Sequence, residues 1–182
     1  MNLTKTNLNG LVIIEPKIFK DSRGYFFEPY NKSKFDKSIG VTDFVQDNES
    51  KSKIGVLRGF HFQKPPFEQA KLVRCIQGEV LDVALDLRKK SPTFGKVESV
   101  ILSEKNKKQL FIPRGFGHAF LVLSETAIFS YKVDNVYSPD HDSGIIWNDP
   151  SLKIDWLIEK SELIISEKDK KLLRLNETKI LF

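Results

Sequence analysis

The sequence predicts an all-β protein whose strands form an antiparallel jelly-roll barrel, with short helices only at its periphery. Between Gly55 and Val136, short runs rich in β-branched and aromatic residues alternate with turn residues at a near-regular spacing. Such a spacing is typical of antiparallel sandwiches and barrels. The runs are, in order, "GVLRGFHF", "AKLVRCI", "GEVLDVALDL", "VESVILSE", "KQLFIP", "HAFLVLSE" and "AIFSYKVDNVY".

The third run shows strand alternation. Because successive side chains of a strand point to opposite faces, Asp82 and Asp86 share one face with Val80 and Ala84. The other face is entirely apolar and consists of Leu81, Val83, Leu85 and Leu87. We therefore expect one face to pack against apolar groups and the other to tolerate carboxylates.

Helices are expected only outside this β-rich region. The stretch "NKSKFDKSIG" (31–40) predicts a short helix that ends at Gly40, and "SEKDKKLLRL" (166–175) predicts another near the C-terminus. There are no repeats, low-complexity tracts or Ser/Gly linkers. Residues 1–182 are accordingly expected to form a single domain.

Composition indicates a cytoplasmic protein. A chain of 182 residues buries roughly 70% of its unfolded surface and needs no disulfide or structural metal to fold. Its only cysteine, Cys75, excludes an internal disulfide and favours a reducing compartment. No apolar run approaches the roughly 18 residues of a membrane helix, and the N-terminus lacks the apolar segment of a signal peptide.

The charge pattern does not favour a nucleic-acid partner. The net charge is +5, but the 29 basic residues are scattered and mixed with 24 acidic ones. Nucleic-acid binders usually gather basic side chains into a patch or stripe. A small, negatively charged ligand is the better interpretation, although compositional bias alone explains the lysine excess equally well.

An arginine and a histidine interrupt the strand "LRGFHFQ" (57–63). Arg58 and His61 are three residues apart, so strict alternation places them on opposite faces. Gly59 lies between them, and a glycine within a strand often marks a bulge that redirects a side chain. With such a bulge, both side chains face one cavity; without it, they are a surface arginine and a surface histidine.

A second motif, "IPRGFGHAF" (112–120), has the P-x-G-x-x-H spacing of cupin barrels and ends at His118. The first cupin motif normally supplies H-x-H, but here the matching residues are His61, Phe62 and Gln63. Isolated histidines without a third nitrogen or carboxylate nearby make a poor transition-metal site. The sequence thus predicts a cupin barrel without a metal.

Three side chains have the types needed to abstract a proton beside a carbonyl group. His61 is suited to be the base, Lys71 to stabilise the enolate oxygen, and Tyr131 to return a proton. Their spacing alone does not show that they converge.

Nearly the whole chain resembles the dTDP-4-dehydrorhamnose 3,5-epimerase family. The resemblance implies that His61 is the base, Tyr131 the acid, and Lys71 the group that stabilises the O4 anion. It also implies that Asp169 pairs with His61, although Ser166-x-x-Asp169 fits a helix capping box as well. The matching runs are "DSRGYFFE", "FVQDNESKSKIGVLRGFHFQ", "QAKLVRCIQGEVLDVALDLRKKSPTFG", "IPRGFGHAF", "YKVDNVYSP", "WNDP" and "LIISEKD".

The resemblance also implies a nucleotide-sugar site. Arginine suits a diphosphate because its fork makes paired hydrogen bonds, and Tyr137 would stack on the thymine. Asp142 replaces a usual glutamate and is one methylene shorter, which puts its contact in doubt. The implied substrate-binding residues are Arg23, Glu28, Gln46, Asp47, Asn48, Arg58, His118, Tyr137, Asp142 and Lys168.

By this resemblance, the expected activity is epimerisation of dTDP-4-dehydro-6-deoxy-D-glucose at C3 and C5 by a homodimer without a metal or other cofactor. Three alternatives stay open. One is an epimerase that acts at one carbon only or on another nucleotide sugar, one is a 3,4-ketoisomerase, and one is a non-catalytic cupin that binds nucleotide sugars.

Overall fold

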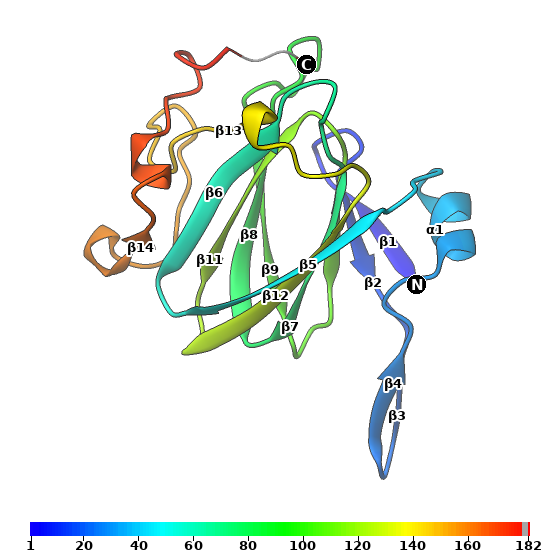
Figure 1. Cartoon of the computed structure of the whole chain (residues 1–182). Helices are drawn as coiled ribbons and strands as arrows, with labels where there is room; N and C mark the ends of the chain where they lie inside the picture. Colours follow the sequence, from blue (N-terminus) through cyan, green and yellow to red (C-terminus); the bar gives the residue numbers. More distant parts are fainter. Residues whose placement is uncertain (180–181) are drawn as a thin grey trace.

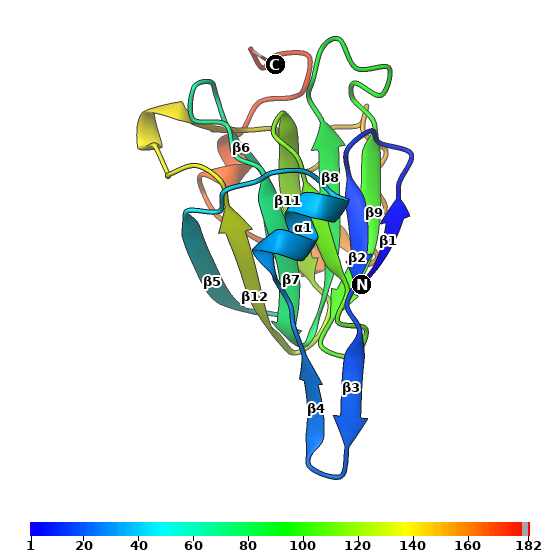
Figure 2. The same cartoon turned by 90° about the vertical axis from the view of Figure 1, so that its right-hand side faces the viewer.

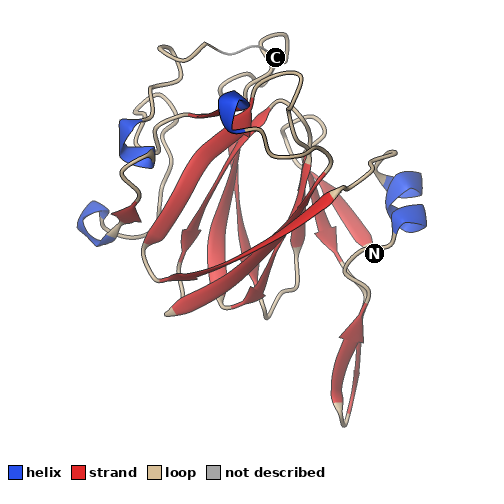
Figure 3. Ribbon diagram, viewed as in Figure 1, coloured by secondary structure: helices blue, strands red, loops and turns tan. Residues whose placement is uncertain are grey.

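The computed structural model describes residues 1–179 and 182, and its framework is two sheets that face each other (Figures 1 and 3). The first sheet has the order β1-β2-β10-β7-β12-β5 and the second the order β13-β6-β11-β8-β9, all antiparallel, with β14 added in parallel to β6. The predicted cupin-type jelly-roll barrel is confirmed. The first sheet comprises β1 (Asn2–Lys5), β2 (Val12–Glu15), β5 (Gln46–Lys53), β7 (Lys71–Gln77), β10 (Gln109–Ile112) and β12 (Thr126–Val133), and the second β6 (Val56–Gln63), β8 (Glu79–Asp86), β9 (Val97–Ser103), β11 (Phe116–Val122), β13 (Asp142–Gly144) and β14 (Ile164–Ile165).

The expected helix near residue 31 is confirmed as α1 (Lys32–Ser38), which lies over the outer face of the first sheet (Figure 2). Asn31 caps it, since its Oδ1 accepts the N–H of Lys34 at 3.1 Å. Phe35 buries the inner side of the helix against Phe111, with ring centroids 5.3 Å apart. Among the described residues, no helix is long and apolar enough to cross a membrane.

The helix expected over residues 166–175 is wrong, because the chain forms only a 3₁₀ turn there, η3 (Asp169–Lys171). Leu172 already has an extended backbone, and Leu173 pairs with Ile145 in a β-bridge. Pairing with the second sheet therefore overrides the local helical pattern. Two further 3₁₀ turns are η1 (Pro139–His141) and η2 (Lys160–Glu162).

Strand β8 is buried on both faces. Its apolar face packs beneath the C-terminal segment, which contributes Leu152 and Trp156. The face with Val80 and Ala84 points into the barrel, where Asp82 and Asp86 are 0% exposed. The carboxylates therefore lie in the interior between the sheets and not in solvent.

A two-stranded hairpin, β3 (Ile18–Asp21) and β4 (Gly24–Phe27), projects from the barrel in both views (Figures 1 and 2). Three of its four aromatic side chains are exposed: Phe19 is 52%, Tyr25 57% and Phe26 70% accessible, whereas Phe27 is partly buried. Apolar side chains gathered in this way are uncommon on the surface of a monomer.

Candidate active site

Of the two alternatives for Gly59, the structure has the bulge, and it aligns the key residues of β6. Between the pairs His118–His61 and Phe120–Arg58, β6 contains one residue more than β11. Gly59 has φ +113°, and a Cβ there would lie 2.5 Å from the carbonyl oxygen of His118. Only glycine fits this close approach. Arg58 and His61 consequently line the same cavity.

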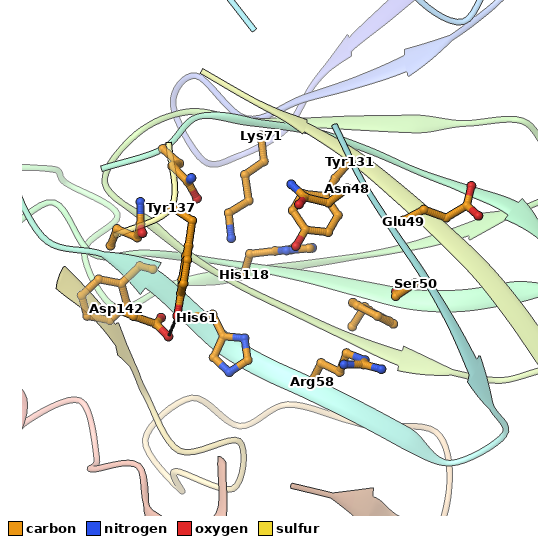
Figure 4. Close-up of a pocket in the computed structure, with 14 residues that line it drawn as sticks. Asn48, Glu49, Ser50, Arg58, His61, Lys71, His118, Tyr131, Tyr137 and Asp142 are labelled. Atoms are coloured by element: carbon orange, nitrogen blue, oxygen red, sulfur yellow. Dashed lines mark hydrogen bonds between the residues drawn. The ribbon is translucent and has the colours of Figure 1, made fainter. Parts of the chain in front are cut away.

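This cavity, of about 370 Å³, lies between the two sheets (Figure 4). Lys71 and Tyr131 enter it from the first sheet, whereas Arg58, His61 and His118 enter it from the second. Its lining residues are Asn48, Glu49, Ser50, Arg58, His61, Phe62, Gln63, Gln69, Lys71, His118, Phe120, Tyr131, Tyr137 and Asp142.

His61 and Asp169 form a hydrogen-bonded pair. The His61 Nε2 lies 2.8 Å from Asp169 Oδ1, and the Gly59 N–H donates to Oδ2 at 3.3 Å. Burial alone would raise the pKa of Asp169, but these hydrogen bonds outweigh it and hold that pKa below its usual value. The ionised carboxylate requires a hydrogen on Nε2, which leaves Nδ1 of the neutral ring free to accept a proton. Ser166 also accepts the N–H of Asp169 at 3.1 Å, so the capping contact coexists with the pair.

Tyr131 lies on β12, in the wall opposite to β6. Desolvation in this wall raises the pKa of its phenol, with a smaller contribution from Asp142 and an opposing one from Arg58. The hydroxyl therefore stays protonated at neutral pH and is able to donate its proton into the cavity.

A second group of charged residues lies deeper in the barrel. Burial lowers the pKa of Lys71 to about 8, despite the opposing effect of Asp82 and Asp142. His118 Nε2 lies 2.8 Å from Asp82 Oδ2, and burial lowers the pKa of His118 too. The site thus combines a buried cation with a buried histidine–carboxylate pair. Asp86, by contrast, accepts hydrogen bonds from the side chains of Arg88, Ser91 and Thr93 and has a structural role.

At the mouth of the cavity, Asp142 bridges two neighbours. Its Oδ2 accepts the hydroxyl of Tyr137 at 3.1 Å and pairs with the ammonium of Lys168 (Figure 4 shows the first contact). The hydrogen bond to Asp142 raises the pKa of Lys168. The shorter aspartate side chain therefore reaches both groups.

The described residues contain no group of three or more His, Cys, Asp or Glu side chains arranged to hold a metal ion.

The family model for dTDP-4-dehydrorhamnose 3,5-epimerase matches residues 5–177. The chain belongs to this family. The dTDP-4-dehydrorhamnose 3,5-epimerase of Escherichia coli (strain K12) is 50% identical over 178 residues, which cover 97% of this chain and 96% of that protein. Two solved structures superpose closely on the whole fold. The dTDP-4-dehydrorhamnose 3,5-epimerase of Elizabethkingia anophelis has a TM-score of 0.94, 52% identity and 97% coverage of both chains. A dTDP-6-deoxy-D-glucose-3,5-epimerase from Legionella pneumophila, in complex with dTDP-4-keto-L-rhamnose, has a TM-score of 0.93, 45% identity, and coverage of 96% of this chain and 93% of that one.

Four of the binding residues implied by the family lie away from this cavity in the single chain. Arg23 projects from the β3–β4 hairpin, where its side chain is 88% exposed and pairs with Asp21. Glu28 follows the hairpin and binds Lys34 at 2.6 Å. Two more lie on β5: Gln46 donates to Asn48 at 2.9 Å, and Asp47 points to the outer face, where it pairs with Lys132.

Several residues that line the cavity are not among the site residues predicted from the sequence. Ser50 shares the inner face of β5 with Asn48, and strand alternation from Asn48 would have found it. Its buried hydroxyl has no hydrogen-bond partner among the described residues, and the same is true of Asp82 Oδ1. Gln63 and Gln69 also line the cavity, and no sequence signal distinguishes them from surface glutamines.

Proposed function

We propose that the protein converts dTDP-4-dehydro-6-deoxy-D-glucose to dTDP-4-dehydro-L-rhamnose by epimerisation at C3 and C5. One observation carries the proposal: the hydrogen-bonded His61–Asp169 pair and the half-buried Tyr131 lie on opposite walls of one cavity. A base and an acid on opposite faces of a substrate can invert a carbon centre. The family membership supports the same reaction.

In the proposed mechanism, His61 Nδ1 takes the proton from a carbon next to the C4 ketone. The electrons of that C–H bond move onto O4, and the ammonium of Lys71 stabilises the resulting enolate. Tyr131 then donates its phenolic proton to the opposite face of the carbon, and the ketone re-forms. C3 and C5 both adjoin the ketone, so the same groups serve both centres once the sugar has reoriented, His61 has released its proton to solvent and Tyr131 has regained one.

The nucleotide occupies the outer part of the cavity in this proposal. Arg58 holds the diphosphate through paired hydrogen bonds, and Tyr137 stacks on the thymine. Asn48 and His118 contact the sugar. Lys168 lies at the mouth of the cavity, where it pairs with Asp142.

We also propose a homodimer in which each protomer's β3–β4 hairpin reaches the partner's site. The exposed Phe19, Tyr25 and Phe26 support a protein–protein contact. The hairpin carries Arg23 and leads to Glu28, so the exchange accounts for implied ligands that lie away from their own cavity. We propose a cytoplasmic location, which the single, unpaired cysteine supports.

Incubation with the proposed substrate in D₂O, followed by NMR, tests the reaction. We expect deuterium at both C3 and C5 and a product that a dTDP-4-dehydrorhamnose reductase accepts. Label at a single carbon would show a mono-epimerase. An unlabelled substrate with tight dTDP binding would show a non-catalytic binding protein, and turnover of only GDP- or UDP-linked 4-ketosugars would refute the thymine contacts.

A further inference from the structure

Gln63, the last residue of β6, is a buried amide whose hydrogen bonds all go to loops. It is 4% exposed, and its Nε2 donates to the carbonyl oxygens of Phe67 at 2.6 Å and Val136 at 3.0 Å. Its Oε1 accepts the N–H of Ser138 at 2.6 Å. One side chain thus binds the backbone on both sides of Tyr137.

The segment 134–138, here called the Tyr137 arm, follows β12 and has no strand pairing of its own. Other contacts join its first two residues to the loop after β6: Gln69 Nε2 donates to the Asn135 carbonyl at 2.8 Å, and Asp134 accepts the Ala70 N–H at 2.6 Å. These contacts stop short of Val136. From there to Ser138, Gln63 joins the arm to β6. Ser138 also contacts η1, since its hydroxyl lies 2.8 Å from His141 Nδ1 and its carbonyl accepts the His141 N–H at 3.1 Å.

Tyr137 itself is held loosely. Its side chain is 54% accessible, and its hydroxyl makes a single hydrogen bond, to Asp142. An aromatic ring at a cavity mouth binds a flat ligand best when its backbone is already fixed, because less conformational entropy is then lost on binding. The hydrogen bonds to Val136 and Ser138 therefore determine how firmly the Tyr137 ring is positioned before a ligand binds.

We infer that Gln63 is a positioning residue that fixes the Tyr137 arm for the nucleobase. The inference rests on the nucleobase role proposed above for Tyr137. Position 63 is also where the H-x-H motif of metal-binding cupins places its second histidine. In this chain, the amide at that position organises a loop through its hydrogen bonds.

The test compares Gln63→Met with the parent. Methionine has a similar length but neither donates to Val136 nor accepts from Ser138, so the arm loses its attachment to β6. We expect KM for the nucleotide sugar and the Kd for dTDP to rise about tenfold, with kcat changed less than about twofold. Amide hydrogen exchange at Val136–Ser138 in the free protein should accelerate as well. An unchanged Kd, or an equal fall in kcat, would overturn the inference.

Asn106→Leu is the matched control, because Asn106 also uses its amide to hold a loop. It donates to the Ile101 carbonyl at 2.9 Å and accepts the N–H groups of Ser103 and Lys108 at 3.1 and 2.9 Å. Asn106 does not line the cavity. We expect it to lower stability without changing the Kd for dTDP. A similar Kd increase in this control would show a general effect of lost loop contacts and refute the specific role.

A double-mutant cycle separates the inference from the proposed function. If Gln63 acts through Tyr137, Gln63→Met has no further effect on dTDP binding in a Tyr137→Ala background, whereas additive effects would refute the coupling. If Tyr137→Ala alone leaves Kd unchanged, the proposed nucleobase contact fails, while faster exchange in the Gln63 variant still reports the attachment. Should Gln63→Met fold poorly, Gln63→Leu removes the same hydrogen bonds to Val136 and Ser138 with a different apolar side chain, and the same rise in Kd and in exchange rate is expected.

Discussion

Replacing Lys71 by methionine is expected to stabilise the fold near neutral pH while removing most of the activity. The buried ammonium has a pKa of about 8, compared with 10.5 for an ordinary lysine. At about 1.4 kcal/mol per pH unit, this difference means that burying the charge costs about 3 kcal/mol at pH 7. Methionine fills the same space without charge. The loss of the enolate-stabilising cation should lower kcat by about 10²- to 10³-fold.

The stability gain should depend on pH. The pKa of Lys71 is lower in the folded than in the unfolded chain, so the unfolded chain binds more protons between about pH 8 and pH 10.5. The parent therefore gains stability as the pH rises through this range, and the advantage of the methionine variant shrinks to about 1 kcal/mol at pH 10.

Urea unfolding of both proteins at pH 7 and pH 10 measures this difference. Lys51→Met, at an exposed lysine on β5, is the control and is expected to change stability by less than about 0.5 kcal/mol at either pH. A variant less stable than the parent at pH 7, or a difference that is the same at both pH values, would show that Lys71 is not a buried charge.

Other predictions concern the remaining site residues. His61→Asn should lower kcat by about 10²- to 10⁴-fold and leave dTDP affinity unchanged, as measured by turnover and calorimetry; equal activity would end its assignment as the base. Tyr131→Phe should exchange solvent deuterium into C3 or C5 faster than it inverts them, and an inversion-to-exchange ratio equal to the parent's would contradict its role as the acid. In the parent, kcat/KM should decline above about pH 8 as Lys71 loses its proton, whereas a flat profile to pH 10 would exclude this titration. Gly59→Ala should cost at least about 2 kcal/mol in urea unfolding, more than Gly40→Ala, because Gly40 shares the positive φ but has nothing within 4 Å of its Cβ position.

The barrel was predictable because strand alternation and turn residues are local signals. The segment 166–175 shows the limit of such signals, since its helical pattern loses to a bridge between Leu173 and Ile145, about 30 residues away. Strand alternation correctly predicted which side chains of β8 share each face. That both are buried depends on the C-terminal segment, whose position no local pattern reveals.

The site was predictable only in part. The glycine at position 59 indicated a bulge on chemical grounds, and the register of β6 with β11 confirms it. The partner of His61 lies 108 residues further along the chain, so only the family resemblance pointed to Asp169. The contacts of Gln63 lie in two separate loops, and no spacing rule connects them.

Because of the C-terminal segment, both catalysis and the cover of the second sheet depend on the last part of the chain. Residues 145–179 cover the apolar outer face of the second sheet, and the same segment delivers the carboxylate that orients His61. Because a chain folds as it is synthesised, the barrel strands emerge before this segment does. A molecule interrupted or cleaved before Ile145 would have a base without its carboxylate and an apolar sheet face exposed to solvent. Incomplete copies are therefore expected to have low activity while they expose the apolar surface that chaperones and proteases recognise.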